Sequence, residues 1–210
     1  MADHEDDLRD EVFAIQVVSG LRTAGFTKAS FQLVHVAGYL LAALSSVYRA
    51  GVLDADVLKR NGAPFVPALQ NGIERLLRRR VVTIEQSFSA SVAVDSVKLD
   101  LEGETLPRAA QRLLSFSNDR ALLELSAEIA MGLSAMDDPI AAFSWDASWS
   151  DPARSENVRI DLSDFQNRSA QVAESIPELL SKLGMGDAQQ VSLYLAHLER
   201  LGESAVNDGR

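Results

Sequence analysis

The chain has 210 residues, no cysteine and a formal net charge of −10 at pH 7, and its hydrophobic fraction of 47% is ordinary for a globular protein. The missing cysteines exclude disulfides, a thiolate nucleophile and zinc–thiolate sites. The acidic total argues against autonomous, non-specific DNA binding, which depends on neutralising phosphates with basic side chains. The acidic N-terminus lacks the residue order of a signal peptide, and no stretch approaches the ~20 apolar residues of a transmembrane helix. We therefore expect a cytoplasmic protein that makes no contact with membranes.

The N-terminal segment predicts an apolar helix that ends near Gly25. Its apolar side chains cover more than one face, so the helix must be buried against its own domain or against another chain. Packing onto the rest of the chain is the simpler interpretation. The alternative is a subunit interface, with Val12, Phe13 and Val17 as the contact residues.

The rest of the first half predicts three helices followed by strands, which is the element order of a winged helix-turn-helix. Apolar side chains recur at three- and four-residue spacing over residues 33–48, a short second helix is expected over residues 54–58, and a third over residues 67–80. The β-branched residues 81–84 and the alternating residues 91–101 predict the strands of a wing. In such folds the third helix is the one that enters a DNA groove.

Several features of this region occur together: His35 within an apolar helix, a Pro-aromatic-x-Pro step from Pro64 to Pro67, Gln70 after it, and an arginine-ended helix before a Val-rich strand. With these features, the runs LVHVAGYLLAAL and GVLDADVLKRNGAPFVPALQNGIERLLRRRVV resemble the middle component of bacterial ABC-three-component conflict systems, which include Lamassu-type anti-phage systems. The region is similar, more distantly, to the winged-helix subunits that accompany SMC ATPases. The resemblance implies a non-catalytic accessory subunit that assembles with an SMC- or ABC-like ATPase and an effector nuclease, and that contacts DNA within the complex.

The third predicted helix carries the basic cluster of the chain. Its candidate contact residues for DNA, or for an acidic partner surface, are Asn71, Arg75, Arg78, Arg79 and Arg80. A structural interpretation competes with both. Glu74 can pair with Arg78 one helical turn away, and arginines near a helix C-terminus interact favourably with the helix dipole.

The second half of the chain predicts helices over residues 105–114 and 117–136, a strand near residues 158–162, and further helices up to Gly202. The expected organisation is mainly α with a small β wing, a winged helix-turn-helix core and a helical C-terminal half. Its predicted parts are an N-terminal helix (1–26), a winged-helix domain (27–102), a helical C-terminal region (103–202) and a flexible tail (203–210).

Trp145 and Trp149 stand four residues apart in the least regular segment of the second half. Tryptophans are frequent energetic centres of protein interfaces, so both are candidate partner contacts. The alternative is that they fix this segment onto its own domain, because irregular segments often need aromatic anchors.

Sequence motifs for catalysis are missing: the chain has no HExxH, no P-loop and no GxSxG. His35 has no histidine or carboxylate spaced to join it, so a structural or solvent-facing role is the better interpretation. We therefore predict no enzyme activity, no cofactor, no catalytic residue and no metal site. The alternative function is a homodimeric winged-helix transcription regulator or antitoxin-like protein, which binds DNA by itself.

Overall fold

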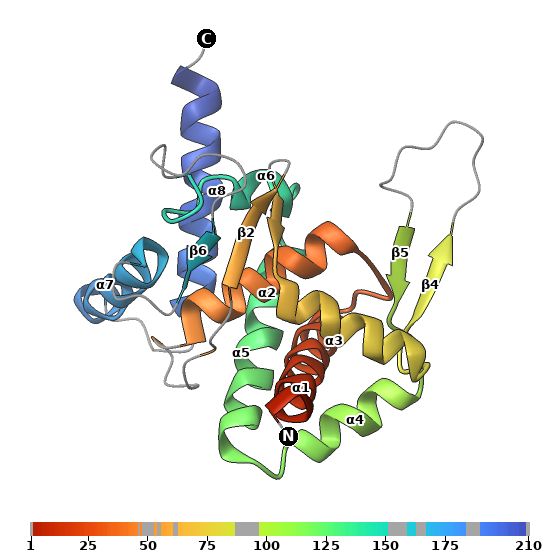
Figure 1. The fold of residues 1–210 in the computed structure, drawn as a ribbon. Coiled ribbons are helices and arrows are strands. Elements are labelled where there is room, and N and C mark those ends of the chain that lie inside the picture. The colour runs from red at the N-terminus through yellow and green to blue at the C-terminus, as the bar shows by residue number, and fades with distance from the viewer. Residues whose placement is uncertain are drawn as a thin grey trace.

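A computed structural model gives the fold of the chain (Figure 1). The structure describes residues 2–45, 47, 53, 56–60, 63–86, 97–150, 159–162, 167–183 and 190–208. Within these ranges the chain forms eight helices and six short strands, and the strands make two antiparallel sheets of three strands each. The predicted fold class, mainly α with a small β wing, is confirmed.

The N-terminal half has winged-helix topology. Three helices precede a hairpin of two strands, and a strand between the first two helices pairs with the second hairpin strand, which gives the order β1-β5-β4. In Figure 1 the hairpin stands on the right. The elements are α1 (Ala2–Thr23), β1 (Lys28–Ser30), α2 (Phe31–Ser45), α3 (Pro67–Arg78), β4 (Thr83–Gln86) and β5 (Val97–Asp100).

The predicted short helix over residues 54–58 is wrong, because the chain forms a strand there. Two strands, β2 (Asp56–Arg60) and β3 (Ala63–Phe65), are inserted between α2 and α3. Arg60 pairs with Ala63, so residues 61–62 connect the strands. Their Asn-Gly sequence is the strongest short-range hairpin signal, although it also suits the end of a helix. The strand β6 (Arg159–Asp161) pairs with β2, and so it extends this second sheet rather than the wing.

The second half of the chain is helical, as predicted. Two helix boundaries differ from the prediction: the helix over residues 168–183 continues through Pro177, and the last helix continues past Gly202 to Asp208, where a tail was expected. In Figure 1 the last helix projects away from the body of the molecule. The helices are α4 (Thr105–Leu113), α5 (Ser117–Ser134), α6 (Pro139–Phe143), α7 (Arg168–Leu183) and α8 (Gln190–Asp208).

A continuous hydrophobic core runs through both halves, from α1 to α8. The helix α1 packs against α3 and α5, and Phe13 and Val17 are buried there at 5% and 0% exposure. Packing within the chain therefore accounts for the apolar character of α1. The helix α2 is buried on all sides from Leu33 to Ser45, because the β2-β3 hairpin and the C-terminal helices cover the face that its polar residues suggested was exposed.

Candidate functional site

His35 is buried and joins α2 to the start of α3. The backbone N–H of Val66 donates to its Nδ1 at 3.2 Å, so Nε2 carries the proton and donates to Oε1 of Gln70 at 3.3 Å. The ring of Phe65 packs against the imidazole, with the two centroids 5.1 Å apart. The residues that carry the family resemblance thus form one structural unit.

Burial lowers the pKa of His35 to about 4, and the hydrogen bond to Gln70 opposes that shift only in part. The imidazole is therefore neutral at pH 7. With both ring nitrogens engaged and the side chain 5% exposed, His35 holds the α3 entry in place rather than reaching a substrate. The structural role predicted for it agrees with this geometry.

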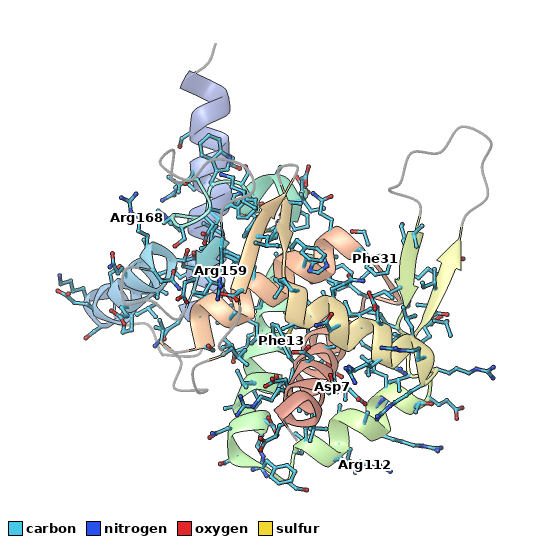
Figure 2. All side chains as sticks on the ribbon, in the orientation of Figure 1. Asp7, Phe13, Phe31, Arg112, Arg159 and Arg168 are labelled. Carbon is cyan, nitrogen blue, oxygen red and sulfur yellow. The ribbon has the colours of Figure 1, made fainter. Side chains whose placement is uncertain are left out.

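The polar face of α3 lies against the acidic start of α1. Asn71 donates to Asp10 at 3.1 Å, Arg75 pairs with Asp7, and Nη1 of Arg79 donates to Oε1 of Glu11 at 2.7 Å. Figure 2 labels Asp7 on α1, beneath α3. We call these three pairs the α1–α3 seam.

The seam is held close by the backbone as well as by charge. Gly72 of α3 sits on the carbonyl of Asp10, and a Cβ built on this glycine would lie 2.0 Å from that oxygen. No residue larger than glycine fits at such an approach without moving a helix. Three of the predicted contact residues, Asn71, Arg75 and Arg79, thus bond to acidic residues of their own chain.

The C-terminal end of α3 remains open to solvent. Arg78 is exposed and donates to the backbone carbonyl of Glu74, and Arg79 and Arg80 are exposed too. Arg80 adopts a left-handed conformation with φ 55°, the position where helices usually end in glycine. The N–H groups of Arg80 and Val81 bond back to the carbonyls of Leu77 and Leu76, which closes the helix in a Schellman motif.

The two tryptophans have different environments. Trp149 is 3% exposed, and its ring lies edge-on to Tyr39 and tilted against Phe143. The ammonium group of Lys59 lies 5.1 Å from its ring centroid and donates to its backbone carbonyl at 2.9 Å. Trp149 therefore fixes this segment onto its own chain, and its side chain is not on the surface for the partner contact predicted for it.

Trp145 lies on the surface, with 38% of the residue exposed. Its indole covers Gly202, where an added Cβ would lie 3.1 Å from the indole nitrogen. The glycine leaves room for the tryptophan at this point of α8. Leu201, beside it on α8, is also 38% exposed. Trp145 and Leu201 are thus two exposed apolar residues, one against Gly202 and the other next to it in the chain, and we call them the surface of Trp145 and Leu201.

Asp146 is the centre of a buried network that the sequence did not reveal. Its Oδ1 accepts hydrogen bonds from Tyr39 and Ser169 at 2.6 Å each, and its Oδ2 accepts one from Tyr194. The backbone N–H groups of Ser148 and Trp149 also donate to Oδ1. The donors come from α2, α7, α8 and the segment that follows α6 (residues 144–150, the α6 loop), so one carboxylate joins four segments.

The Asp146 network is fully enclosed. Asp146, Ser148 and Tyr39 are each 0% exposed, and Ser169 is 0% exposed as well. Burial, and secondarily the charge of Asp146, raises the pKa values of Tyr39 and Tyr194 well above the ordinary range. Both tyrosines therefore remain protonated donors, and the arrangement suits structural specificity rather than proton transfer to a substrate.

Other predicted residues are distributed over the surface and core. Val12 is half-buried and lines a groove beside α1. Among the described residues, no group of three carboxylate or histidine side chains is placed to bind a metal ion. No helix of the described chain is long and apolar enough to cross a membrane.

Asp146 and its tyrosines were missed because each looks ordinary in sequence. Tyr39 falls on the polar side of the α2 pattern, and Asp146 lies between two tryptophans in an irregular segment. A polar residue on a helix that is otherwise apolar all round was the available signal.

Comparison with protein-family models, curated proteins and solved structures finds no match for this chain.

Proposed function

We propose that this protein is a non-catalytic accessory subunit, which assembles with an SMC- or ABC-like ATPase and an effector nuclease in a cytoplasmic anti-phage defence complex. It acts in that complex through protein contacts, as a scaffold that holds the ATPase and the effector close to DNA. The sequence resemblance names the partners, and the surface of α3 supports the scaffolding role.

The α1–α3 seam is the observation that carries this proposal. A winged helix that reads DNA presents the polar face of its third helix to phosphates and bases. Here that face is occupied by Asp7, Asp10 and Glu11 of α1. A phosphate that approached Arg75 would also approach these carboxylates, and the repulsion would offset the attraction. The seam thus favours a winged helix that works as an assembly module.

The surface formed by Trp145 and Leu201 supports the same role. Trp145 stays partly exposed although the chain has an enclosed aromatic cluster close by, around Trp149. Exposed tryptophans at the edge of a structured surface are typical anchors of protein interfaces. We place a partner contact here, at the base of the projecting α8.

The second candidate is the homodimeric DNA-binding regulator, which the end of α3 favours. Arg78, Arg79 and Arg80 are all exposed there, and Arg80 holds a left-handed position that glycine occupies with less strain. A side chain kept at such a position is explained if the guanidinium contacts phosphate. This candidate requires duplex binding by the purified protein, with a steep salt dependence.

Co-purification separates the two candidates. The tagged wild-type chain is expressed from its native operon beside two variants, Trp145→Ala and Phe116→Ala. Phe116 is 63% exposed at the α4–α5 corner and serves as the matched aromatic control. We expect a large ATPase to elute with the wild type and with Phe116→Ala, and to be lost from Trp145→Ala.

Two other results would change the conclusion. If the ATPase also elutes with Trp145→Ala, the subunit role stands and the partner contact lies elsewhere. If the wild type elutes alone as a small dimer that binds duplex DNA, the regulator replaces the accessory subunit.

A further inference from the structure

A groove of about 680 Å³ runs beside the N-terminal half of α1, where this helix meets the starts of α3 and α5. Val12, Phe13 and Leu122 give it an apolar lining. Leu8 also lines it and is 60% exposed. Figure 2 labels Phe13, where α1 passes beneath α3. The groove is thus apolar inside and carries an exposed leucine.

The polar lining of the groove is acidic. Asp6, Asp10 and Asp119 line it, and Arg9 is the one cation among its described lining residues. Burial raises the pKa values of Asp10 and Asp119, and the hydrogen bonds from Asn71 and Gln16 do not reverse these shifts. Both carboxylates are therefore partly desolvated without full compensation. A cation that entered the groove would stabilise their charged forms.

Gln16 adds an acceptor that the described part of the chain leaves without a hydrogen bond. The residue is 1% exposed and lines the groove, and its Nε2 donates to Oδ1 of Asp119 at 3.0 Å. The carboxylate accepts only from the amide nitrogen, so this bond fixes Oε1 on the other side. Within the described part of the chain, Oε1 has no hydrogen-bond partner although it is buried. The lining of the groove thus contains an amide that is satisfied at its nitrogen and not at its oxygen.

We propose that this groove docks a basic amphipathic segment of a partner protein. Lysine or arginine side chains reach Asp10 and Asp119, while apolar side chains of the same segment cover Leu8 and Phe13. Long basic side chains can lay their alkyl stems on apolar surface and keep their charged heads at polar groups. An amphipathic helix in a groove is a recurrent form of peptide recognition. Nucleic acid does not fit, because its phosphates would meet three carboxylates.

This inference rests on the proposed function, because it gives the chemistry of one partner segment of the accessory subunit. It adds a second contact, on a different part of the molecule from the surface of Trp145 and Leu201. The groove is formed by α1, α3 and α5, whereas that surface is formed by the α6 loop and α8.

A binding titration with a defined peptide tests the groove on the full chain. The probe is a fluorescein-labelled helical peptide with leucines on one face and lysines on the other. Its control has the same composition in an order without helical periodicity. We expect the amphipathic peptide to bind the wild type by fluorescence anisotropy, and the control peptide to bind at least about tenfold more weakly, because it cannot present both faces together.

Matched variants distinguish the groove from general attraction to an acidic protein. Asp6→Asn/Asp119→Asn should weaken binding about tenfold, since it removes two of the three carboxylates of the groove, among them the partly desolvated Asp119. The control Glu124→Gln/Asp137→Asn changes the net charge equally at exposed positions outside the groove, and we expect it to bind as the wild type does. Leu8→Ser should weaken binding as well, whereas Met131→Ser, at 50% exposure on α5, should not.

Hydrogen exchange locates the peptide. Slower exchange over residues 6–16 and 117–123 supports the groove. Equal weakening in both charge variants, or protection elsewhere, overturns it. A wild-type dimer that Leu8→Ser converts to a monomer in sedimentation overturns it too, because a second copy then fills the groove.

The two proposals fail in different ways. If the ATPase co-purifies with the wild type and equally with Leu8→Ser and Asp6→Asn/Asp119→Asn, the groove is not its contact and the accessory role stands. If nothing co-purifies but the peptide binds at the groove, the accessory role fails and the groove remains a basic-segment site.

Discussion

Two regions of this molecule use carboxylates to join segments far apart in sequence, and they do so in opposite ways. Asp146 is fully buried and accepts hydrogen bonds from neutral donors, among them Tyr39 and Tyr194. In the α1–α3 seam, carboxylates pair with cationic guanidinium groups that water can reach: the side chain of Arg79 is 63% exposed, although that of its partner Glu11 is only 10% exposed. One region is an enclosed network and the other is an ion-paired surface.

The difference indicates what each region does. A buried carboxylate with all its donors in place fixes one arrangement of the chain, and it is destabilising when a donor or the acceptor is removed. Ion pairs exposed to solvent contribute little to stability, because water screens them. The seam is held instead by close backbone packing at Gly72, and its charges mainly decide what the surface of α3 attracts.

The largest effect is expected at Asp146. In Asp146→Asn one acceptor oxygen becomes an N–H donor that faces hydroxyl or amide donors, so we expect a loss of about 3–5 kcal/mol in the free energy of unfolding. Denaturant titration measures it. The control Asp137→Asn makes the same chemical change at an exposed position, and its free energy of unfolding should stay within about 0.5 kcal/mol of the wild-type value. If both variants unfold alike, the network is not a stabilising centre.

His35 extends the comparison to a buried group whose charged form is unfavourable. Its folded pKa of about 4 lies below the unfolded value of 6.5. The folded chain therefore binds fewer protons, and the contribution of this group is complete above pH 6.5 and is lost as the pH falls towards 4. The loss reaches about 3 kcal/mol at the acid end of that range.

The variant His35→Gln isolates this effect from the carboxylates that titrate in the same range. We expect the stability difference between wild type and His35→Gln to shrink as the pH falls from 6.5 to 4, measured by urea unfolding at each pH. His197→Gln provides the control. A constant difference across that range would mean that His35 does not titrate with folding.

Backbone packing in the seam gives the third effect. In Gly72→Ala the new Cβ would lie 2.0 Å from the carbonyl oxygen of Asp10, so α1 and α3 must separate, and we expect a loss of about 1–3 kcal/mol from overpacking. In Gly132→Ala the Cβ would meet Cδ1 of Leu195, a side chain that can rotate. Thermal unfolding should show a smaller loss of stability in Gly132→Ala. Alanine also favours the helix over glycine by about 1 kcal/mol, which offsets part of that loss. Equal losses would argue against a rigid seam.

The sequence predicted the helices and strands better than the contacts between them. Helical periodicity located α3 and α5, because their apolar stripes face one core. It failed at residues 54–58, because the Asn-Gly dipeptide that follows at residues 61–62 suits both a helix end and a hairpin. In the structure this segment pairs with β3 and with β6. Pairing between strands about a hundred residues apart leaves no local signal.

The candidate site shows the same limit. The arginines of α3 were found from their spacing, but their partners on α1 were not, because helix periodicity says nothing about which acidic segment lies opposite. Gly202 suggested a helix end, whereas in the structure it leaves room for Trp145 within a continuous helix. Neither relation can be obtained from composition or periodicity.

The smallest stability effect, and the most informative for function, is expected from the charges of the seam. Removing the α1 carboxylates in Asp7→Asn/Asp10→Asn/Glu11→Gln should change stability by about 1 kcal/mol or less per pair, because at least one member of each ion pair is partly solvated. DNA affinity should change far more. With the carboxylates neutral, Arg75 and Arg79 are free to meet phosphates, and the variant should bind duplex DNA more tightly. The slope of log binding constant against log salt concentration should become steeper by about one for each phosphate contacted.

The wild type itself should bind duplex weakly, which anisotropy titrations over a salt series can measure beside the variant. The control Glu124→Gln/Asp137→Asn/Glu199→Gln removes equal charge away from the seam, and so reports the effect of net charge by itself. If that control gains as much affinity, the acidic total and not the seam limits DNA binding. If the wild type already binds tightly and the seam variant gains nothing, then the exposed end of α3 at Arg78 and Arg80 suffices for DNA contact. The regulator is then the better account of this winged helix, because its arginines reach phosphate despite the carboxylates beside them.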